Sequence, residues 1–373
     1  MDKVSIICKS IEHYRVDFFA RLYQTLQDKQ VCLQVITGEY QGDTEDMPWL
    51  IIIPNKSISI IGRELIWQPC LEHIKDSDLV IVEQANKLIL NYYLLALRAF
   101  TKKKLAFWGH GRNFQSEKEF GLEEKIKSMV SRLPDWWFGY TRRSLDLLVR
   151  LGYPKDKITI VNNSIDTSRM KSKYSKIKDE EMVGLAQSLG INSKNIGIYI
   201  GALYKAKKIG FLIEACMQVK KQISDFELII VGSGEDEGYV QDMSTKYSWI
   251  HYAGPVYGDE KLLYLKLAKV YLLPGVIGLA ILDAFATETP PILIAQKGHG
   301  PEISYMQSGE NGVLVEENST SGQYADKLVQ VLNDDPIYNK LVGGCCVSSQ
   351  EYSLEKMVDN FAGGICLALD SQE

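Results

Sequence analysis

The sequence alternates short runs of β-branched and aliphatic residues with longer segments of helical periodicity. This alternation is typical of βα units arranged around a parallel sheet. The strands predicted in the first half of the chain are Val4–Cys8, Val31–Ile36, Leu79–Val82, Lys104–Trp108, Trp136–Tyr140 and Ile158–Val161. Those predicted in the second half are Ile196–Ile200, Glu227–Val231, Trp249–Tyr252, Val270–Leu273, Pro291–Ile294 and Val313–Val315. The pattern therefore predicts an α/β protein with two doubly wound parallel sheets.

A charged segment separates the two series of strands. Eight of the thirteen residues from Arg169 to Glu181 are charged, which is typical of a solvated linker or an exposed helix. We therefore expect an N-terminal domain over residues 1–168, a linker over 169–190 and a C-terminal domain over 191–350. Residues 351–373 have the apolar spacing of one helical face, and we expect a helix that packs back towards the N-terminal domain.

The composition and charge of the chain limit which binding partners and which cellular compartment we expect. The net charge is −5, and a pI near 5.7 supplies no basic surface for nucleic acid. No apolar run reaches the ~18–20 residues that a membrane-spanning helix needs, and no signal peptide is evident. The seven cysteines form no CxxC pair, which favours buried thiols in a reducing compartment over disulfides or zinc. We expect a cytoplasmic protein with no metal and no cofactor.

One motif follows the predicted strand Val270–Leu273. Ligands of doubly wound folds bind where strands end at the carboxyl edge of the sheet. Here a glycine-bearing loop leads into a helix that is predicted to begin near Gly278 or Leu279. The free N–H groups of a first helical turn attract phosphate-type anions, and Gly275 lets the backbone approach a ligand. Asp283, one turn further on, would reach ligand hydroxyls; alternatively, the segment is a plain crossover with Asp283 in solvent.

A second motif follows the predicted strand Ile196–Ile200. Gly201 is followed by three lysines, Lys205, Lys207 and Lys208, just before an amphipathic helix. Lysines at this edge could neutralise a diphosphate without a metal. The alternative is a solvated turn.

Two other segments imitate ligand-binding motifs. Asp76-Ser-Asp78 has the DxD form of some metal sites, but it precedes a strand and so falls at the amino edge of the sheet. Gly232–Gly238 imitates a dinucleotide fingerprint, but its glycine spacing is wrong and its three acids would repel a pyrophosphate. We interpret both as structural turns.

The C-terminal half resembles the family-4 retaining glycosyltransferases of the bacterial surface-glycan type. The resemblance covers most of residues 190–335 and is carried by the two motifs above, Gly232-Ser-Gly234, His299-Gly-Pro-Glu-Ile303 and Gly309-Glu-Asn-Gly-Val-Leu-Val315. It implies the GT-B fold, in which two facing Rossmann-like domains enclose a cleft. In that family, a Gly-Arg-Leu run and a following lysine hold the donor's diphosphate, and two glutamates spaced E-x7-E contact the donor sugar and the ribose.

The resemblance also implies roles for individual residues, with two departures. Lys207 matches the family's lysine and Asp283 its second carboxylate, whereas Ala202 replaces the arginine and Gly275 the first carboxylate. His110 resembles the histidine that hydrogen-bonds the donor sugar. The expected catalytic residues are His110, Lys207 and Asp283, and the expected donor-binding residues are Gly201, Lys205, Lys208, Gly275, Gly278, Leu279 and Glu302.

Two residues of the N-terminal half are expected to bind the acceptor. Arg15 follows the first strand and is an anion contact, unless it pairs with a carboxylate on a helix surface. Glu83 directly follows the strand Leu79–Val82 and is placed for an acceptor hydroxyl, unless its role is structural.

The function implied is metal-independent, retaining transfer of a hexosyl group in polysaccharide biosynthesis. The donor would be a UDP-, GDP- or dTDP-sugar and the acceptor a glycan or a polyprenyl-linked glycan. Thr101–Lys104, beside an aromatic-rich helix, would either contact the inner face of the membrane or simply complement the helix dipole. Gly275 and Ala202 keep open a non-catalytic GT-B nucleotide-binding or scaffold protein, and a sugar-nucleotide epimerase is a further alternative.

Overall fold

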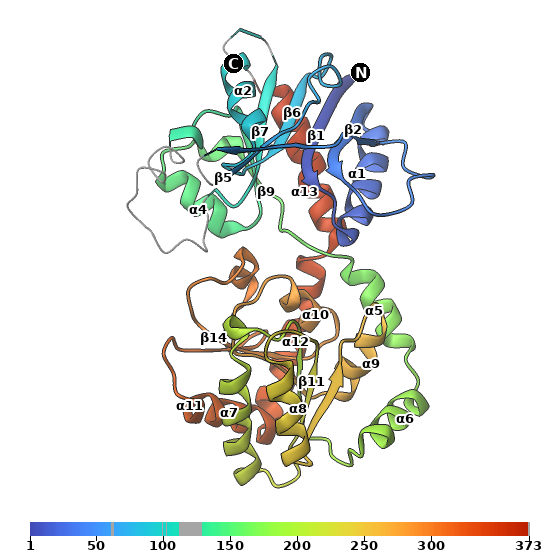
Figure 1. The fold of residues 1–373 in the computed structure, drawn as a ribbon, viewed down its shortest axis with the longest axis vertical. Coiled ribbons are helices and arrows are strands. Elements are labelled where there is room, and N and C mark those ends of the chain that lie inside the picture. Colours follow the sequence, from blue (N-terminus) through green and yellow to red (C-terminus); the bar gives the residue numbers. More distant parts are fainter. Residues whose placement is uncertain (61–62, 99, 102, 112–128, 372–373) are drawn as a thin grey trace. The chain divides into compact units, whose positions relative to one another are not determined.

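The computed structural model describes residues 1–60, 63–98, 100–101, 103–111 and 129–371. The chain forms two compact units (Figure 1). Unit 1 contains Met1–Asp166 together with Leu354–Glu373, and unit 2 contains Thr167–Ser353. Each unit has a parallel sheet with helices packed against it, which confirms the predicted α/β class.

Unit 1 is built on a seven-stranded parallel sheet with the order β3-β2-β1-β6-β7-β8-β9. A separate antiparallel hairpin pairs β4 with β5. The elements are β1 Asp2–Ser10, η1 His13–Arg15, α1 Val16–Asp28, β2 Val31–Glu39, β3 Leu50–Ile52, β4 Lys56–Ile60, β5 Arg63–Trp67, β6 Leu79–Glu83, α2 Ile89–Arg98, β7 Lys104–Gly109, β8 Trp136–Gly139, α4 Arg142–Arg150, η2 Lys155–Lys157, β9 Ile158–Ile160 and α13 Leu354–Asp370.

The two faces of this sheet carry separate apolar cores. Because side chains alternate along a strand, Ile6 of β1 enters one core while its neighbour Ile7 enters the other. The first core also contains buried residues of α1 and α13, including Phe18 and Phe361, whose ring centroids lie 5.4 Å apart. The C-terminal helix therefore completes the core of unit 1, although the strands that precede it in the chain belong to unit 2.

Unit 2 is built on a six-stranded parallel sheet with the order β12-β11-β10-β13-β14-β15. Its elements are α5 Thr167–Lys176, α6 Asp179–Leu189, β10 Ile196–Ile200, η3 Lys205–Lys207, α7 Ile209–Gln222, β11 Glu227–Val231, α8 Glu237–Lys246, β12 Ile250–Gly254, α9 Glu260–Leu267, β13 Val270–Leu273, α10 Ala280–Ala286, β14 Pro291–Ile294, η4 Pro301–Tyr305, β15 Val313–Val315, α11 Ser321–Asn333 and α12 Asp335–Glu351.

Residues 169–190, expected to be a solvated linker or an exposed helix, contain most of α5 and all of α6, and both helices belong to unit 2. Its charges have partners within the same unit. Lys171 pairs with Glu288 at 2.8 Å, and Lys173 pairs with Asp259. The charged run therefore forms two surface helices, and ion pairs connect the first of them to the rest of unit 2.

Each sheet reverses its strand order at one point. In unit 1 the reversal lies between the adjacent strands β1 and β6, and in unit 2 it lies between β10 and β13. Connections leave such neighbouring strands in opposite directions, which opens a crevice at their carboxyl ends where ligands of this architecture bind. The residues that follow these four strands are therefore the candidates for function.

Candidate functional site

The loop after β10 is held by backbone contacts with the loop after β11. Leu203 N–H donates to Ser233 O at 2.8 Å. A Cβ on Gly232 would lie 1.9 Å from Gly201 O, and one on Gly234 would lie 2.3 Å from Leu203 O. Glycine is thus required at 232 and 234 by the close approach of two loops, which agrees with interpreting this segment as a structural turn.

Lys207 stands at the end of η3, against the loop that follows β13. Its Nζ donates to Val276 O at 2.6 Å, and Val276 N–H donates back to Ala206 O at 3.0 Å. Among the residues that the structure describes, no carboxylate forms an ion pair with Lys207. Burial lowers the pKa of the Lys207 ammonium from its ordinary value. An ammonium has three N–H donors, so the bond to Val276 leaves two for an anionic ligand.

The other two lysines of this motif are placed differently. Lys205 is exposed, as the solvated-turn alternative expects. Lys208 is half-buried and has a φ of 57°, in the left-handed region, where it serves as the N-cap of α7. Of these three lysines, Lys207 is the one whose ammonium is hydrogen-bonded to the loop after β13.

Gly275 has no room for a side chain. A Cβ there would lie 2.3 Å from Lys207 Cα and 2.5 Å from Ala206 O. The backbone of η3 occupies the space into which a glutamate at this position would project. The departure from the paired carboxylates therefore has a local packing cause, which nothing in the sequence of this loop alone reveals.

A buried histidine fixes the rest of the β13–α10 loop. His299 Nδ1 accepts from Ile277 N–H at 3.1 Å, which places the ring proton on Nε2, and Nε2 donates to Ile294 O at 2.9 Å. Glu302 is 4% exposed, and its Oε2 is 4.0 Å from the place where a Cβ on Gly278 would lie. The sequence placed Glu302 near the donor but assigned His299 no role of its own.

The helix after this loop, α10, is seven residues long and begins at Ala280 with Leu279 as its N-cap. Asp283 lies in its first turn and is 9% exposed, so it is not the solvated residue of the alternative interpretation. Both carboxylate oxygens accept from Lys261 Nζ, each at 2.8 Å. Lys261 belongs to α9, and its pairing with Asp283 depends on how two helices pack, so the sequence offered no signal for it.

In unit 1, Arg15 lies among aromatic rings. It is 9% exposed, and its guanidinium carbon lies 5.4 Å from the ring centroid of Tyr14, 5.1 Å from that of Trp108 and 5.7 Å from that of Tyr140. Nη1 also lies 3.8 Å from the sulfur of Met357. Among the described residues no carboxylate forms an ion pair with Arg15.

Glu83 ends β6, next to the strand that precedes Arg15. Its Oε2 accepts from Lys9 N–H at 2.8 Å. Burial raises the pKa of the Glu83 carboxyl, and the charges of Arg15, Lys9 and Lys87 oppose that rise in part. Glu83 therefore has both a structural bond and a perturbed carboxyl at the carboxyl edge of the sheet.

His110 follows β7 and is half-buried. Its ring packs edge-on against Tyr140, with centroids 4.3 Å apart. Gly111 has a φ of 77°, which a glycine adopts without strain, so the chain turns sharply after the histidine. Arg112 and Asn113, the last residues of this motif, lie outside the described residues. Tyr140 contacts both His110 and Arg15, and thereby links two predicted site residues.

The structure also places the DxD segment and two lysines of Thr101–Lys104. Asp78 of the DxD segment accepts from Lys3 N–H at 2.8 Å, at the amino end of β1. Lys104 Nζ donates to Leu369 O and Ser371 O, both at 2.6 Å, and Lys103 Nζ donates to carbonyl oxygens of the chain near Ile74. The ammonium groups of these two lysines are therefore hydrogen-bonded to the chain itself.

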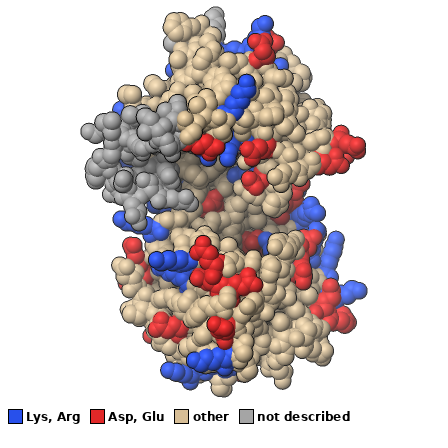
Figure 2. All heavy atoms as spheres, viewed as in Figure 1, with Lys and Arg blue, Asp and Glu red and all other residues tan. Residues whose placement is uncertain are grey.

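Figure 2 shows Lys and Arg interspersed with Asp and Glu on the face in view. None of the described helices is both long enough and apolar enough to span a membrane. Within the same residues, no three His, Cys, Asp or Glu side chains gather in a way that would hold a metal ion.

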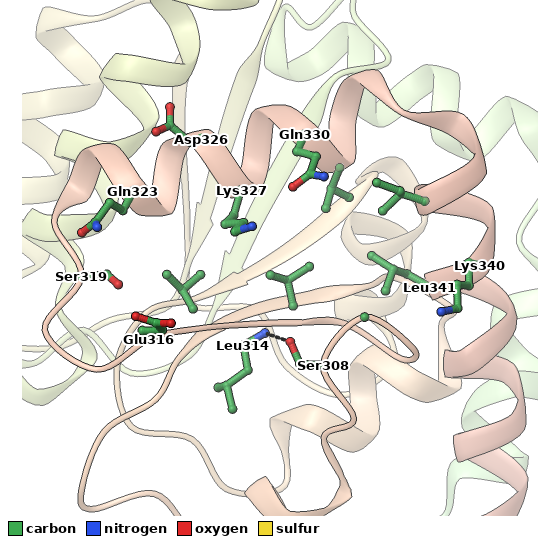
Figure 3. A pocket seen from close by; sticks show the side chains of 15 residues that line it. Ser308, Leu314, Glu316, Ser319, Gln323, Asp326, Lys327, Gln330, Lys340 and Leu341 are labelled. Carbon is green, nitrogen blue, oxygen red and sulfur yellow. Dashed lines mark hydrogen bonds between the residues drawn. The ribbon is translucent and has the colours of Figure 1, made fainter.

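A pocket of about 840 Å³ lies elsewhere in unit 2 (Figure 3). Its walls come from the edge strand β15 and from α11 and α12, and the side chain of Lys327 projects into it. No predicted site residue lines it. Leu314 N–H, at the free edge of β15, is already bonded to Ser308 Oγ at 3.0 Å.

The structure thus gathers the predicted residues into two clusters, one in each unit. In unit 2, Gly201, Lys207, Gly275, Gly278 and Asp283 lie around the ends of β10 and β13. In unit 1, Arg15, Glu83 and His110 lie around the ends of β1, β6 and β7. The aromatic residues Tyr14, Trp108 and Tyr140 also belong to the second cluster. They were not among the site residues predicted from the sequence, although Tyr140 could have been proposed because it ends a predicted strand.

Comparison with known proteins gives a match in the second half of the chain. Residues 185–364 match the family Glycosyl transferases group 1. The alpha-monoglucosyldiacylglycerol synthase of Acholeplasma laidlawii is 25% identical over 223 residues, which are 58% of this chain and 54% of that protein. The chain spans about half the length of the curated relatives it matches.

Solved structures resemble the whole chain. HepE of Anabaena, in complex with UDP, has a TM-score of 0.71 at 14% identity over 98% of this chain and 100% of that one. A glycosyltransferase from Rickettsia africae ESF-5 has a TM-score of 0.71 at 14% identity over 99% of both chains. The chain therefore has the GT-B fold of two Rossmann-like domains, and its residues 185–364 match the group 1 glycosyl transferases.

Proposed function

We propose that this protein is a retaining glycosyltransferase that moves a sugar from a nucleotide-diphosphate sugar to a glycan or lipid-linked glycan. The observation that carries the proposal is Lys207, an ammonium that is partly buried, has no carboxylate partner among the described residues and lies at the point where strand order reverses. Such a group is unfavourable in the empty protein and favourable once a diphosphate binds. The match to group 1 glycosyl transferases covers this site.

In the proposed reaction, the bond between the anomeric carbon and the donor's diphosphate oxygen breaks. The acceptor hydroxyl attacks from the same face and gives its proton to the departing phosphate. Lys207, with the lysines beside it, would neutralise the charge that develops on that phosphate. His110 would orient the donor sugar, and Asp283 would contact the ribose while Lys261 holds its carboxylate in place.

The names and bound ligands of similar proteins support the choice of substrates. HepE of Anabaena has been solved with UDP-glucose, which supports a UDP-sugar donor. The relative from Acholeplasma laidlawii is named for a diacylglycerol product, which supports a lipid-linked acceptor. All seven cysteines are free thiols, which supports a cytoplasmic location. A lipid-linked acceptor implies peripheral contact with the inner face of the membrane.

The experiment is a screen of UDP-, GDP- and dTDP-sugars for thermal stabilisation, followed by transfer assays with the donors that bind. A ligand at a hundred times its Kd stabilises the protein by ~2.7 kcal/mol. Transfer with retained anomeric configuration supports the proposal, and inverted product contradicts it.

A non-catalytic nucleotide-binding protein is the second candidate, because Gly275 removes one of the two expected carboxylates. Binding without turnover across donors and acceptors would favour it. Conversion of the donor sugar with no acceptor present would instead identify an epimerase.

A further inference from the structure

Arg15 is a buried cation whose hydrogen-bond donors are almost unused. Its side chain comes from η1, directly after β1, and the residue is 9% exposed. A guanidinium has five N–H donors in a planar fork. Among the described residues, the sulfur of Met357 at 3.8 Å is its single hydrogen-bond partner, and sulfur is a weak acceptor. Folded proteins rarely leave a buried charged donor in this state without a ligand, ion or water to complete it.

The surroundings stabilise the charge without satisfying the donors. The rings of Tyr14, Trp108 and Tyr140 lie within 5.7 Å of the guanidinium carbon, close enough for cation–π attraction. Aromatic faces attract a cation, but they do not replace oxygen acceptors in the plane of the fork. This arrangement keeps Arg15 rigid, charged and ready for a group that presents two oxygens.

The neighbouring carboxylate does not neutralise Arg15 directly. Glu83 accepts from Lys9 N–H, and no ion pair joins it to Arg15. Arg15 also lies at the reversal of strand order in unit 1, where ligands of doubly wound folds bind. The ring of Tyr140 lies 4.3 Å from that of His110 and 5.7 Å from the Arg15 guanidinium carbon, so both residues adjoin the same tyrosine.

We propose that Arg15 binds an oxyanion, a phosphate or a carboxylate, carried by the acceptor substrate. Assigning the anion to the acceptor rests on the proposed function, whereas the anion site itself does not. Unit 2 has its own cation, Lys207, for the donor's diphosphate, so the second unpaired cation calls for a second anionic group. The acceptor class that follows is a phosphorylated glycan or lipid carrier, or a glycan that contains an acidic sugar.

The test uses the full chain carrying Lys207→Ala, which removes the unit 2 cation. Inorganic phosphate and glucuronate are titrated separately by calorimetry, and each is also followed by tryptophan emission because Trp108 adjoins the guanidinium. We expect Arg15→Gln to weaken binding of at least one probe about tenfold or more. Arg15→Lys keeps the positive charge but loses the planar fork of N–H donors, so its affinity for the probes should lie between those of the parent and Arg15→Gln. Arg150→Gln, an exposed arginine of the same unit, is the matched control and should bind as its parent does.

The outcomes separate the possibilities. Arg15-dependent binding of phosphate points to a phosphorylated acceptor, and Arg15-dependent binding of glucuronate to an acidic sugar. Equal affinity for both probes in Arg15→Gln and its parent overturns the proposal, and lower stability with that result would show that Arg15 is structural. If Arg15→Gln does not fold, the comparison is made with Arg15→Lys.

A further arm measures UDP affinity with Lys207 intact. We expect Arg15→Gln to leave it unchanged; a matching tenfold loss would mean that Arg15 holds the donor's phosphates, and would overturn the assignment to the acceptor. If the unmodified protein binds no nucleotide at all, the proposed function fails, while Arg15-dependent binding of phosphate still stands.

Discussion

The two units reverse their strand order in the same way, but one forms its ligand-binding edge from backbone and the other from side chains. In unit 2, the edge is made of backbone: Gly201, Gly232 and Gly275 let neighbouring loops touch, and Lys207 is bonded to a loop carbonyl. In unit 1, the edge is made of side chains, with Arg15 among aromatic rings and His110 packed on Tyr140. A parallel sheet with reversed strand order therefore fixes where a ligand binds, and it leaves open how the binding surface is made.

The two ligand-binding edges should differ in how well they tolerate amino-acid substitutions. A loop packed backbone to backbone has no flexible atom that can yield, so added volume at a glycine must move the chain. A cluster of side chains can repack around a lost group. Substitutions in the two units should therefore fail in different ways, and the following changes test that contrast from the largest expected effect to the smallest.

Lys207→Ala should lower turnover by about two orders of magnitude or more while the fold survives, because preorganised contacts to a developing charge contribute ~3–4 kcal/mol. The measurement is kcat with the best donor from the screen, alongside circular dichroism. Lys221→Ala, an exposed lysine at the end of α7, is the control and should keep its activity. Near-normal turnover in Lys207→Ala would remove this residue from the mechanism and break the contrast between the units.

Gly275→Ala should destabilise the protein by about 1–3 kcal/mol, because its Cβ would lie 2.3 Å from Lys207 Cα and force η3 away. Urea unfolding measures the effect. Gly184→Ala in α6 is the matched control: a Cβ there meets nothing within 4 Å, so alanine should stabilise the helix by about 0.5–1 kcal/mol. Equal stability of the two variants would show that the loops of unit 2 can yield after all.

Asp283→Asn should weaken nucleotide binding about tenfold, which corresponds to ~1.4 kcal/mol. Calorimetry with the nucleotide measures the change. Lys261→Met breaks the same ion pair from the other side and leaves the carboxylate in place. A larger loss of affinity in Asp283→Asn than in Lys261→Met supports a ribose contact; equal losses would mean that the pair only stabilises the packing of α9 on α10.

Glu83→Gln should change how stability depends on pH. Burial raises the pKa of the folded Glu83 above its ordinary value of 4.5, so the folded state holds this proton more tightly than the unfolded state does. The stabilisation is complete below the ordinary pKa and is lost as pH rises through the raised value. Urea unfolding across mildly acid to neutral pH should therefore show the unmodified protein losing stability relative to Glu83→Gln. Parallel profiles would show that Glu83 titrates as in the unfolded chain.

The sequence predicted the regular part of the fold closely. β10, β11, β13, β14 and β15 have the predicted bounds, because strands buried on both faces appear as continuous apolar runs. The antiparallel hairpin of β4 and β5 was missed because it is partly exposed, with Ile58 45% exposed, and lacks such runs. For the charged run at Arg169–Glu181 the sequence left a linker and an exposed helix open, because ion-pair partners such as Glu288 lie more than a hundred residues away.

For the candidate site, the sequence supplied the residues that follow strands, and the structure supplied their neighbours. Lys207 and Asp283 could be proposed from local motifs, and so could His110 and Arg15. The partner of Asp283 could not, since Lys261 belongs to another helix. The absence of a carboxylate at Gly275 could be read directly, but its cause, the backbone of η3, could not.

The sequence by itself determined the alternation of strands and helices and the glycine and lysine motifs at the strand ends, because these depend on neighbours along the chain. Only the tertiary structure decided that Arg15 would be enclosed by Tyr14, Trp108, Tyr140 and Met357. These residues come from four separate segments, and the last belongs to a helix that follows the whole of unit 2. Strand order and helix packing bring them together, and neither is encoded in the local pattern of residues.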